Sequence, residues 1–311
     1  MKIVFAGTPD FAVLPLKAIV ERGYEVVGVI TQEDKPQGRK GILTPPPVKT
    51  LALSLGLPVF QPKKIREFVS ELVALRADIM ITCAYGQILT QEVLDAFPKG
   101  VWNIHAGLLP YYRGASPIQS CILSGETQTG VTVMKTELGL DCGDILCEER
   151  IDILPDETYG ELSDRLSALS APLILRALEL LEGEYTLTPQ ASEGVRVVRK
   201  ISKEQVKIDF SRSVNEIVNL VRAANPAPVA FAQTENGILN IYRAEAAEWR
   251  EEYASAQKGE VVCDIPKKGL IVRCGDGAVK LTEVQAAGGK RMKGGDFLNG
   301  KKICRGQVLK C

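Results

Sequence analysis

Short apolar runs alternate with segments of helical character along the first 150 residues, and this alternation limits the folds open to the chain. Strands separated by helices favour a mostly parallel sheet with helices on both of its faces. The pattern therefore predicts a Rossmann-like α/β domain. The predicted strands are Lys2–Ala6, Tyr24–Thr31, Val59–Phe60, Asp78–Ala84, Val101–His105 and Val131–Thr136.

Three helices are predicted in this part of the chain. Thr8 is a candidate N-cap and Pro9 suits the first helical position, so we expect a helix that runs to Arg22. A second helix is expected at about Val48–Leu55. Apolar residues at three- and four-residue steps predict a long helix over 158–184, and Pro172 inside it could kink or break it.

The pattern changes after residue 182. The stretch 182–200 is polar and loses its periodicity. Beyond it come a helix at Ser213–Ala224 and then short strands with turn residues between them, which favour a small β-barrel with an oligonucleotide-binding (OB) type barrel as one candidate. A chain of 311 residues is about twice the length of one ~150-residue domain. We therefore expect a first domain at 1–188, a linker at 189–206 and a second domain at 207–311.

The charge of the chain is balanced in total but not along its length. There are 38 basic and 38 acidic residues, yet residues 1–202 carry 20 basic against 25 acidic side chains and residues 203–311 carry 18 against 13. Residues 257–311 carry 12 against 5, a net charge of +7. A basic second domain is typical of a surface that meets phosphates, and it is also compatible with a merely solvated face.

Other sequence features exclude several classes of protein. The apolar runs are shorter than a membrane span, and residues 1–7 form too short an apolar run for a signal peptide, so we expect a soluble, cytoplasmic protein. We also expect a monomer. The eight cysteines form no Cys-x-x-Cys pair, and we expect no metal site. The first turn, Gly7–Phe11, lacks the glycine spacing that dinucleotides require. Serine-hydrolase elbows, P-loops and zinc-protease motifs do not occur.

Two clusters of residues carry candidate chemistry. Asn103 and His105 lie two residues apart at the end of a predicted strand, so they share a face at the edge where α/β sheets bind ligands. An amide beside an imidazole suits stabilisation of an oxyanion together with proton transfer, and His105 is the one histidine of the chain. Asp141 and Asp144 follow another strand in a glycine-rich loop. They could orient the histidine or simply form a turn.

Four features of the chain occur together: Asn103-Ile104-His105, Leu108-Leu109-Pro110, Tyr112–Gln119 and Asp141. In this combination the chain resembles the folate-dependent formyltransferase family. Other motifs resemble the methionyl-tRNA formyltransferases in particular: Phe5–Phe11, Thr31-Gln32 with Pro36–Lys40 and Pro45–Lys49, Arg222–Pro226, and Asp296–Leu298 with Gly306–Leu309. The resemblance extends over nearly the whole chain.

The resemblance implies a set of functional residues. Asn103, His105 and Asp141 match the catalytic trio of the family. The folate-binding residues would be Ile88, Asp141 and Gly107-Leu108-Leu109-Pro110, where Gly107 replaces the serine of the family signature. The tRNA-binding residues would be Arg39 and Lys40 in a basic loop and Lys290, Arg291 and Lys293 in an OB-type second domain.

The implied reaction transfers a formyl group from 10-formyltetrahydrofolate to the amino group of initiator methionyl-tRNA in a bacterium. Asn103 and a protonated His105 would stabilise the oxyanion, while Asp141 raises the pKa of His105 and helps to relay a proton. Two alternatives remain open. The acceptor could be a small amine, or the chain could bind tRNA without catalysis.

Overall fold

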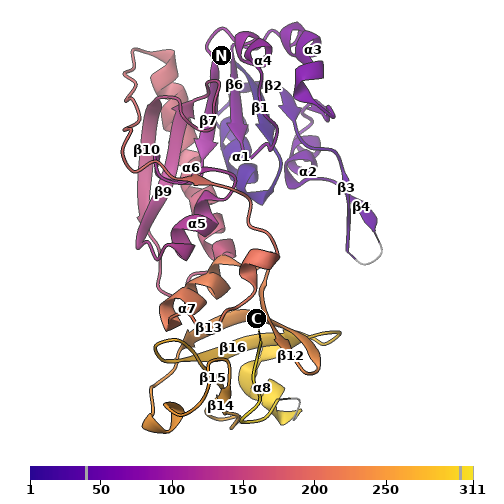
Figure 1. The fold of residues 1–311 in the computed structure, drawn as a ribbon. Helices are drawn as coiled ribbons and strands as arrows, with labels where there is room; N and C mark the ends of the chain where they lie inside the picture. Colours follow the sequence, from indigo (N-terminus) through magenta and orange to yellow (C-terminus); the bar gives the residue numbers. More distant parts are fainter. Residues whose placement is uncertain (39–40, 301–302, 311) are drawn as a thin grey trace. The chain divides into compact units, whose positions relative to one another are not determined.

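The computed structural model describes residues 1–38, 41–300 and 303–310, and the chain divides into two compact units (Figure 1). The first unit comprises Met1–Pro117, Gln128–Ile151 and Ser163–Val198. The second unit comprises Ile118–Thr127, Asp152–Leu162 and Arg199–Cys311. The predicted domain boundaries at 188 and 206 stay a prediction.

The first unit is built on a seven-stranded sheet with the order β10-β9-β7-β6-β1-β2-β5. The five strands from β7 to β5 are parallel, and β9 pairs with β7 in the antiparallel sense. The mostly parallel Rossmann-like sheet is therefore confirmed. Its strands are β1 (Lys2–Gly7), β2 (Glu25–Ile30), β5 (Val59–Phe60), β6 (Ile79–Cys83), β7 (Val101–His105), β9 (Gln128–Lys135) and β10 (Ile145–Asp152).

Both faces of the sheet centre are covered. Val4 and Ala6 of β1 pack in one cluster with Leu72 and Val93, which lie on two short helices. Ile3 and Phe5 point to the opposite face and are also fully buried. The helices of the first unit are α1 (Val13–Glu21), α2 (Pro47–Ser54), α3 (Val69–Ala74), α4 (Gln91–Asp95) and most of α6 (Tyr159–Glu182), with 3-10 turns at Asp10–Ala12 and Ile65–Glu67. The helix α5 (Pro117–Leu123), apart from its first residue, and the start of α6 up to Leu162 belong to the second unit.

The first helix begins later than predicted, and the long helix is not broken at its proline. Pro9 is the N-cap of the 3-10 turn rather than the first residue of a helix, and α1 begins only at Val13. The hydroxyl of Thr8 donates a hydrogen bond to the carbonyl oxygen of Tyr85 at 3.0 Å instead of capping the helix. Pro172 lies inside α6, which nevertheless continues to Glu182.

Two small sheets complete the first unit. The strands β3 (Lys35–Gln37) and β4 (Ile42–Thr44) form an antiparallel hairpin that projects from the unit (Figure 1). In the second small sheet, β8 (Arg113–Gly114) pairs in parallel with β11 (Val197–Val198). The strand β11 falls inside the predicted linker, so part of that polar segment is hydrogen-bonded to the first unit.

The second unit contains a curled antiparallel sheet in the order β12-β13-β16-β15-β14, and β17 adds to β16. Its strands are β12 (Ala230–Thr234), β13 (Gly237–Ala246), β14 (Val261–Cys263), β15 (Leu270–Arg273), β16 (Ala278–Ala286) and β17 (Met292–Lys293). Its helices are α7 (Val214–Ala223) and α8 (Gly294–Asn299), with 3-10 turns at Glu204–Val206 and Glu251–Tyr253.

Residues 307–310 bridge the two end strands of this sheet. Gln233 of β12 exchanges two backbone hydrogen bonds with Lys310, each 2.9 Å long. At the other end, the N–H of Val261 donates to the carbonyl oxygen of Gln307 at 2.8 Å. The register of β13 on β16 also shifts around Arg243, which adds curvature to the sheet. Residues 307–310 thus connect the two end strands of the curled sheet.

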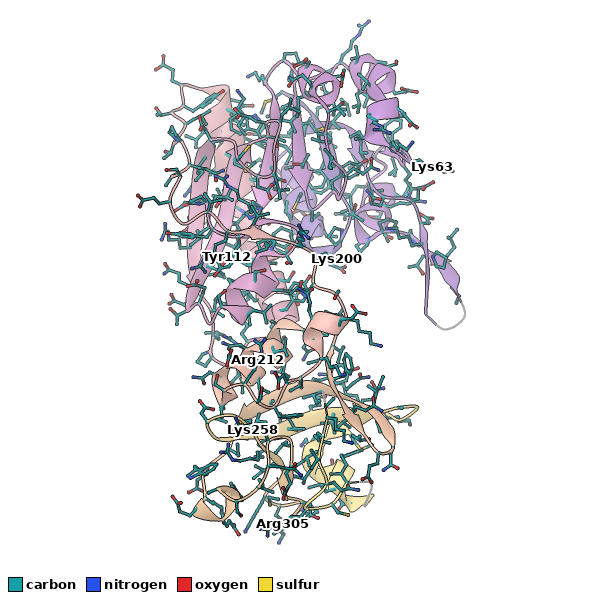
Figure 2. All side chains as sticks on the ribbon, in the orientation of Figure 1. Lys63, Tyr112, Lys200, Arg212, Lys258 and Arg305 are labelled. Atoms are coloured by element: carbon teal, nitrogen blue, oxygen red, sulfur yellow. The ribbon has the colours of Figure 1, made fainter. Side chains whose placement is uncertain are left out.

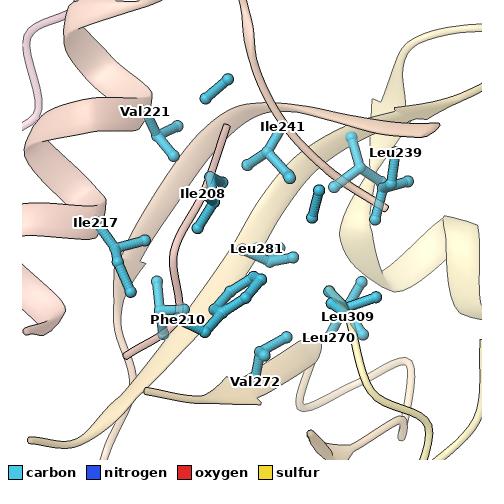
Figure 3. Packing of buried hydrophobic residues seen from close by; sticks show 14 of the residues in the cluster. Ile208, Phe210, Ile217, Val221, Leu239, Ile241, Leu270, Val272, Leu281 and Leu309 are labelled. Carbon is cyan, nitrogen blue, oxygen red and sulfur yellow. The ribbon is translucent and has the colours of Figure 1, made fainter. Parts of the chain in front are cut away.

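The core of the second unit lies between α7 and this sheet. Ile217 and Val221 point from the helix onto apolar side chains of the strands (Figure 3). The core residues labelled there are Ile208, Phe210, Ile217, Val221, Leu239, Ile241, Leu270, Val272, Leu281 and Leu309.

A capping box fixes the start of α7 and generates a stability prediction. The Ser213 hydroxyl accepts from the Glu216 N–H at 3.2 Å, and the Glu216 carboxylate accepts from the Ser213 N–H at 3.0 Å. We expect Ser213→Ala to lower the free energy of unfolding of the second unit by about 1 kcal/mol in urea titrations. Ser211→Ala is the control, because Ser211 uses its backbone N–H in its local hydrogen bond. Equal effects of the two changes would contradict the prediction.

Candidate functional site

The candidate site lies at the carboxyl end of β7. Asn103 is half-buried there, and His105 is 4% exposed. The neighbouring strand β6 places Thr82 beside Asn103, and β9 places Thr132 beside His105. The sequence prediction that Asn103 and His105 share one sheet edge is consistent with this pairing.

Thr82 sets the orientation of the Asn103 amide. Its hydroxyl donates to Asn103 Oδ1 at 2.8 Å. With Oδ1 held by a donor, the amide nitrogen points the other way, and Asn103 Nδ2 lies 3.5 Å from Asp141 Oδ1. The amide N–H groups are therefore presented to the site, where an oxyanion could accept from them.

Asp141 reaches the site from the loop between β9 and β10. Its Oδ2 accepts from the Gly114 N–H at 2.8 Å and lies 3.6 Å from His105 Nδ1. Asp141 has a φ of +47°, which aspartate tolerates better than most residues. Gly143 is needed in the same loop because a side chain there would collide with the carbonyl oxygen of Lys135. The glycine-rich loop is thus more than a simple turn, since it brings Asp141 beside β7.

The environment of His105 makes it a proton acceptor. Its Nε2 lies 3.1 Å from the carbonyl oxygen of Tyr112, which can only accept, so Nε2 carries the proton in the neutral ring. Nδ1 is then free to take a proton on the side of Asp141. Burial lowers the pKa of His105, and this effect outweighs the opposing effects of Asp141 and of the Tyr112 carbonyl. Asp141 raises the pKa of His105, as expected from the sequence, but burial has the larger effect and lowers it.

The predicted folate segment follows β7 directly. The Gly107 carbonyl oxygen accepts from the Thr132 hydroxyl at 2.7 Å, and the Leu109–Pro110 peptide bond is cis. A Cβ atom at Gly107 would lie 3.3 Å from His105 Nε2 and 3.2 Å from Pro117 Cβ. A serine would thus be tight here, while the backbone contact to Thr132 needs no side chain. Leu108 is half-buried in the same segment, and Ile88 lies apart from it in the sequence and is 91% exposed.

The predicted tRNA contacts differ in their surroundings. Arg39 and Lys40 lie outside the described residues. Lys290 and Lys293 are exposed. Arg291 makes a two-point ion pair with Glu283, at 2.5 and 2.7 Å, and stacks 4.1 Å from the centre of the Tyr242 ring. Basic side chains are spread over the second unit, as Arg212, Lys258 and Arg305 show (Figure 2).

Sequence reasoning missed four partners of the predicted trio. Thr82 and Thr132 were detectable in principle, since they belong to strands that flank β7. The Tyr112 carbonyl and Gln190 were not, because a backbone oxygen carries no side-chain signal and Gln190 lies 49 residues from Asp141, whose carbonyl oxygen it contacts.

Comparisons with known proteins show the family of this chain. The model of the formyl transferase family matches residues 1–178, and the model of its C-terminal domain matches residues 200–302. The chain belongs to the formyl transferase family. It is 44% identical to the methionyl-tRNA formyltransferase of Symbiobacterium thermophilum, over 96% of this chain and 92% of that one. It is 42% identical to the methionyl-tRNA formyltransferase of Bacillus subtilis, over 99% and 97% of the two chains.

Solved structures of formyl transferases and related proteins share the fold at low identity. HypX from Aquifex aeolicus in complex with tetrahydrofolic acid matches with a TM-score of 0.65 at 18% identity, over 100% of this chain, which spans about half of HypX. The N-formyltransferase of Helicobacter canadensis, in complex with folinic acid and dTDP-3-aminofucose, matches with a TM-score of 0.68 at 19% identity. The match covers 90% of this chain and 98% of that one. The methionyl-tRNA formyltransferase from Clostridium thermocellum matches with a TM-score of 0.56 at 19% identity. The match covers 79% of this chain and 93% of that one.

Residues 1–38, 41–300 and 303–310 include no group of three or more His, Cys, Asp or Glu side chains placed to hold a metal ion. Within the same ranges, no helix has both the length and the apolar character to cross a bilayer.

The hydrogen bond from Thr82 to Asn103 generates a kinetic prediction. Thr82→Val keeps the shape of the side chain but removes the donor, so the Asn103 amide loses its fixed orientation. We expect kcat for formyl transfer to fall about tenfold, because a less well oriented Asn103 amide loses part of its hydrogen bond to the oxyanion. Thr31→Val is the control, since the buried Thr31 hydroxyl has no hydrogen-bond partner among the described residues. Equal kcat values for the two variants would count against the role of Thr82.

The electrostatics of His105 generate a second prediction, which uses the fact that the chain has one histidine. Histidine-labelled protein gives the NMR signals of that ring alone, and we expect its pKa to lie below 6.5. Asp141→Asn removes a charge that raises the pKa, so the value should fall further, while Asp144→Asn should leave it unchanged. A rise in Asp141→Asn would overturn the prediction.

The same pKa shift has a consequence for stability. Because folding lowers the pKa of His105, the unfolded chain binds more protons just below pH 6.5. The contribution of His105 to stability is therefore lost as the pH falls through that value.

Proposed function

We propose that this chain transfers the formyl group of 10-formyltetrahydrofolate to the α-amino group of methionine esterified to initiator tRNA. The observation that carries the proposal is the convergence of Asn103, His105 and Asp141 at one edge of the sheet. The Asn103 amide is oriented by Thr82, and Asp141 Oδ2 lies 3.6 Å from His105 Nδ1. Relatives at 42–44% identity over nearly the full chain carry the name of this activity.

The reaction begins with attack of the amine on the formyl carbon. An α-amine titrates near ~8, so enough is neutral at pH 7 to act as a nucleophile. As the new C–N bond forms, negative charge grows on the formyl oxygen, and the Asn103 amide donates a hydrogen bond to it. Asn103 is thus the principal oxyanion donor, because His105 is neutral at this stage.

His105 then moves the proton. Nδ1 accepts a proton from the attacking nitrogen, and the Asp141 carboxylate stabilises the imidazolium that results. When the bond between the formyl carbon and N10 of the folate breaks, the imidazolium returns the proton to N10. The products are the formylated amine and tetrahydrofolate, and His105 is neutral again.

The folate is proposed to bind along Gly107–Pro110, close to Asp141 and Ile88. Gly107 lacks the hydroxyl of the serine in the family signature, so the hydrogen bond from Thr132 to its carbonyl oxygen supports the loop here. The half-buried Leu108 would offer apolar contact to the pterin ring.

The second domain, 207–311, is proposed to be an OB-type barrel that holds the tRNA, with residues 1–188 as the catalytic domain and 189–206 as the linker. The bridging of the end strands by residues 307–310 and the net charge of +7 over residues 257–311 support this role. Lys290 and Lys293 would contact phosphates, and Arg39 and Lys40 the acceptor end. Arg291 is paired with Glu283, so it would contact a phosphate only by giving up this ion pair. We propose a monomer in the bacterial cytoplasm.

The decisive experiment is a transfer assay with 10-formyltetrahydrofolate and charged initiator tRNA. Charged elongator tRNA, free methionine and a small amino sugar serve as alternative acceptors. We expect formylation of the initiator tRNA alone. Transfer to the amino sugar alone would assign a different acceptor, and tRNA binding without any transfer would leave a binding protein.

Removal of the proposed oxyanion donor should be costly. We expect Asn103→Ala to lower kcat by about 10²–10³-fold, because the Asn103 amide contacts the transition state more strongly than the substrate. The dissociation constant for folate, measured by calorimetry, should change little in comparison. A variant that loses folate binding and keeps its kcat would contradict the assignment.

A further inference from the structure

The segment Thr188–Val198 runs along the candidate site and contacts both of its loops. At one end, Thr188 exchanges backbone hydrogen bonds with Ile145, at 2.8 and 2.9 Å, just beyond the Asp141 loop. At the other end, β11 pairs with β8 next to Tyr112. We call residues 188–198 the bracing segment.

Gln190 is the member of this segment that touches the Asp141 loop. Its Nε2 donates to the carbonyl oxygens of Asp141 and Gly143, at 2.9 and 2.7 Å. Its Oε1 accepts from Nε and Nη2 of Arg113, at 3.0 and 2.7 Å. A glutamine amide offers two donors and two acceptor sites, and here all four are used within one unit. Gln190 therefore ties the Asp141 loop to the turn that carries Arg113.

The other end of the bracing segment holds that turn. The N–H groups of Arg113 and Ala115 donate to carbonyl oxygens of the segment, at 2.8 and 2.9 Å. The Arg196 guanidinium lies 5.5 Å from the centre of the Tyr112 ring and donates to its hydroxyl at 2.9 Å. This turn supplies both the Tyr112 carbonyl that contacts His105 and the Gly114 N–H that donates to Asp141.

Both held loops have backbone conformations that need support. Asp141 has a φ of +47° and Tyr112 a φ of +55°. Such a conformation is uncommon for aspartate and rarer for a bulky residue like tyrosine, and it persists only where the surroundings impose it. The bracing segment contacts both residues.

We propose that Gln190 is a positioning residue that holds Asp141 against His105 during formyl transfer, with Arg113 as its partner. The expected effect of Gln190 on kcat rests on the proposed function, whereas its effect on the position of Asp141 beside His105 does not. Gln190 acts through the Asp141 loop and needs no contact with either substrate.

Two variants of Gln190 test the proposal. Gln190→Met removes both donors and adds no charge. Gln190→Glu also removes both donors but keeps a partner for Arg113, and it places an oxygen against two carbonyl oxygens. We expect each to lower kcat by about 10- to 100-fold, the usual effect of a misplaced catalytic group, while the KM for folate changes less. Gln91→Met on α4 is the control, because Gln91 is exposed and bonds only within its own helix, to Asp95.

The NMR titration of His105 distinguishes positioning from simple destabilisation. Withdrawal of the Asp141 charge removes an effect that raises the pKa of His105, so this pKa should be lower in Gln190→Met than in the parent chain. Unfolding would instead move it up to 6.5. If the Gln190 variants do not fold, Arg113→Met tests the same support, with the same direction of change expected.

The positioning role of Gln190 and the proposed function can fail independently of each other. An unchanged kcat and an unchanged pKa of His105 in folded Gln190→Met would overturn the positioning role. If the parent chain itself transfers no formyl group, the proposed function fails, and the pKa of His105 still decides whether Gln190 positions Asp141.

Discussion

The Asp141 carboxylate is the interaction on which the candidate site depends. It accepts from the Gly114 N–H, approaches the Asn103 amide and faces Nδ1 of His105. Asn103 and His105 belong to β7 and Gly114 to β8, and the carboxylate lies beside all three groups. A buried imidazole with a lowered pKa can accept a proton, but it needs a nearby negative charge to hold that proton. Asp141 provides this charge.

The support of this carboxylate comes mainly from backbone and neutral side chains. The Gly114 N–H and the Gln190 amide place Asp141 without adding a competing charge beside His105. Thr82 orients Asn103 in the same way, through a neutral hydroxyl. The charge balance of the site is therefore left to the histidine and the aspartate, which suits a reaction that begins and ends with a neutral imidazole.

The second unit shows a different use of distant contacts. Residues 307–310 join the two end strands of a curled sheet, so the end of the chain completes the structure that the preceding strands begin. The solved structures that share the fold at 19% identity include a methionyl-tRNA formyltransferase and an N-formyltransferase in complex with dTDP-3-aminofucose. A common fold at this identity does not select the acceptor, which is why the transfer assay includes both kinds.

The sequence by itself determined the alternation of strands and helices, the placement of Asn103 and His105 on one face of β7, and the membership of the family. These features are local or carried by short motifs, since strand periodicity places side chains two residues apart on the same face. Even the capping box at Ser213 is readable from four consecutive residues.

Only the tertiary structure decided how the site works. Burial and the Asp141 charge shift the pKa of His105 in opposite directions. How deeply His105 is buried could not be predicted from the sequence. Gln190, the Tyr112 carbonyl and the bridging residues 307–310 act across long separations in the chain, through backbone atoms or a neutral amide. Such contacts leave no periodicity or motif, because they depend on which loops the folded sheet brings together.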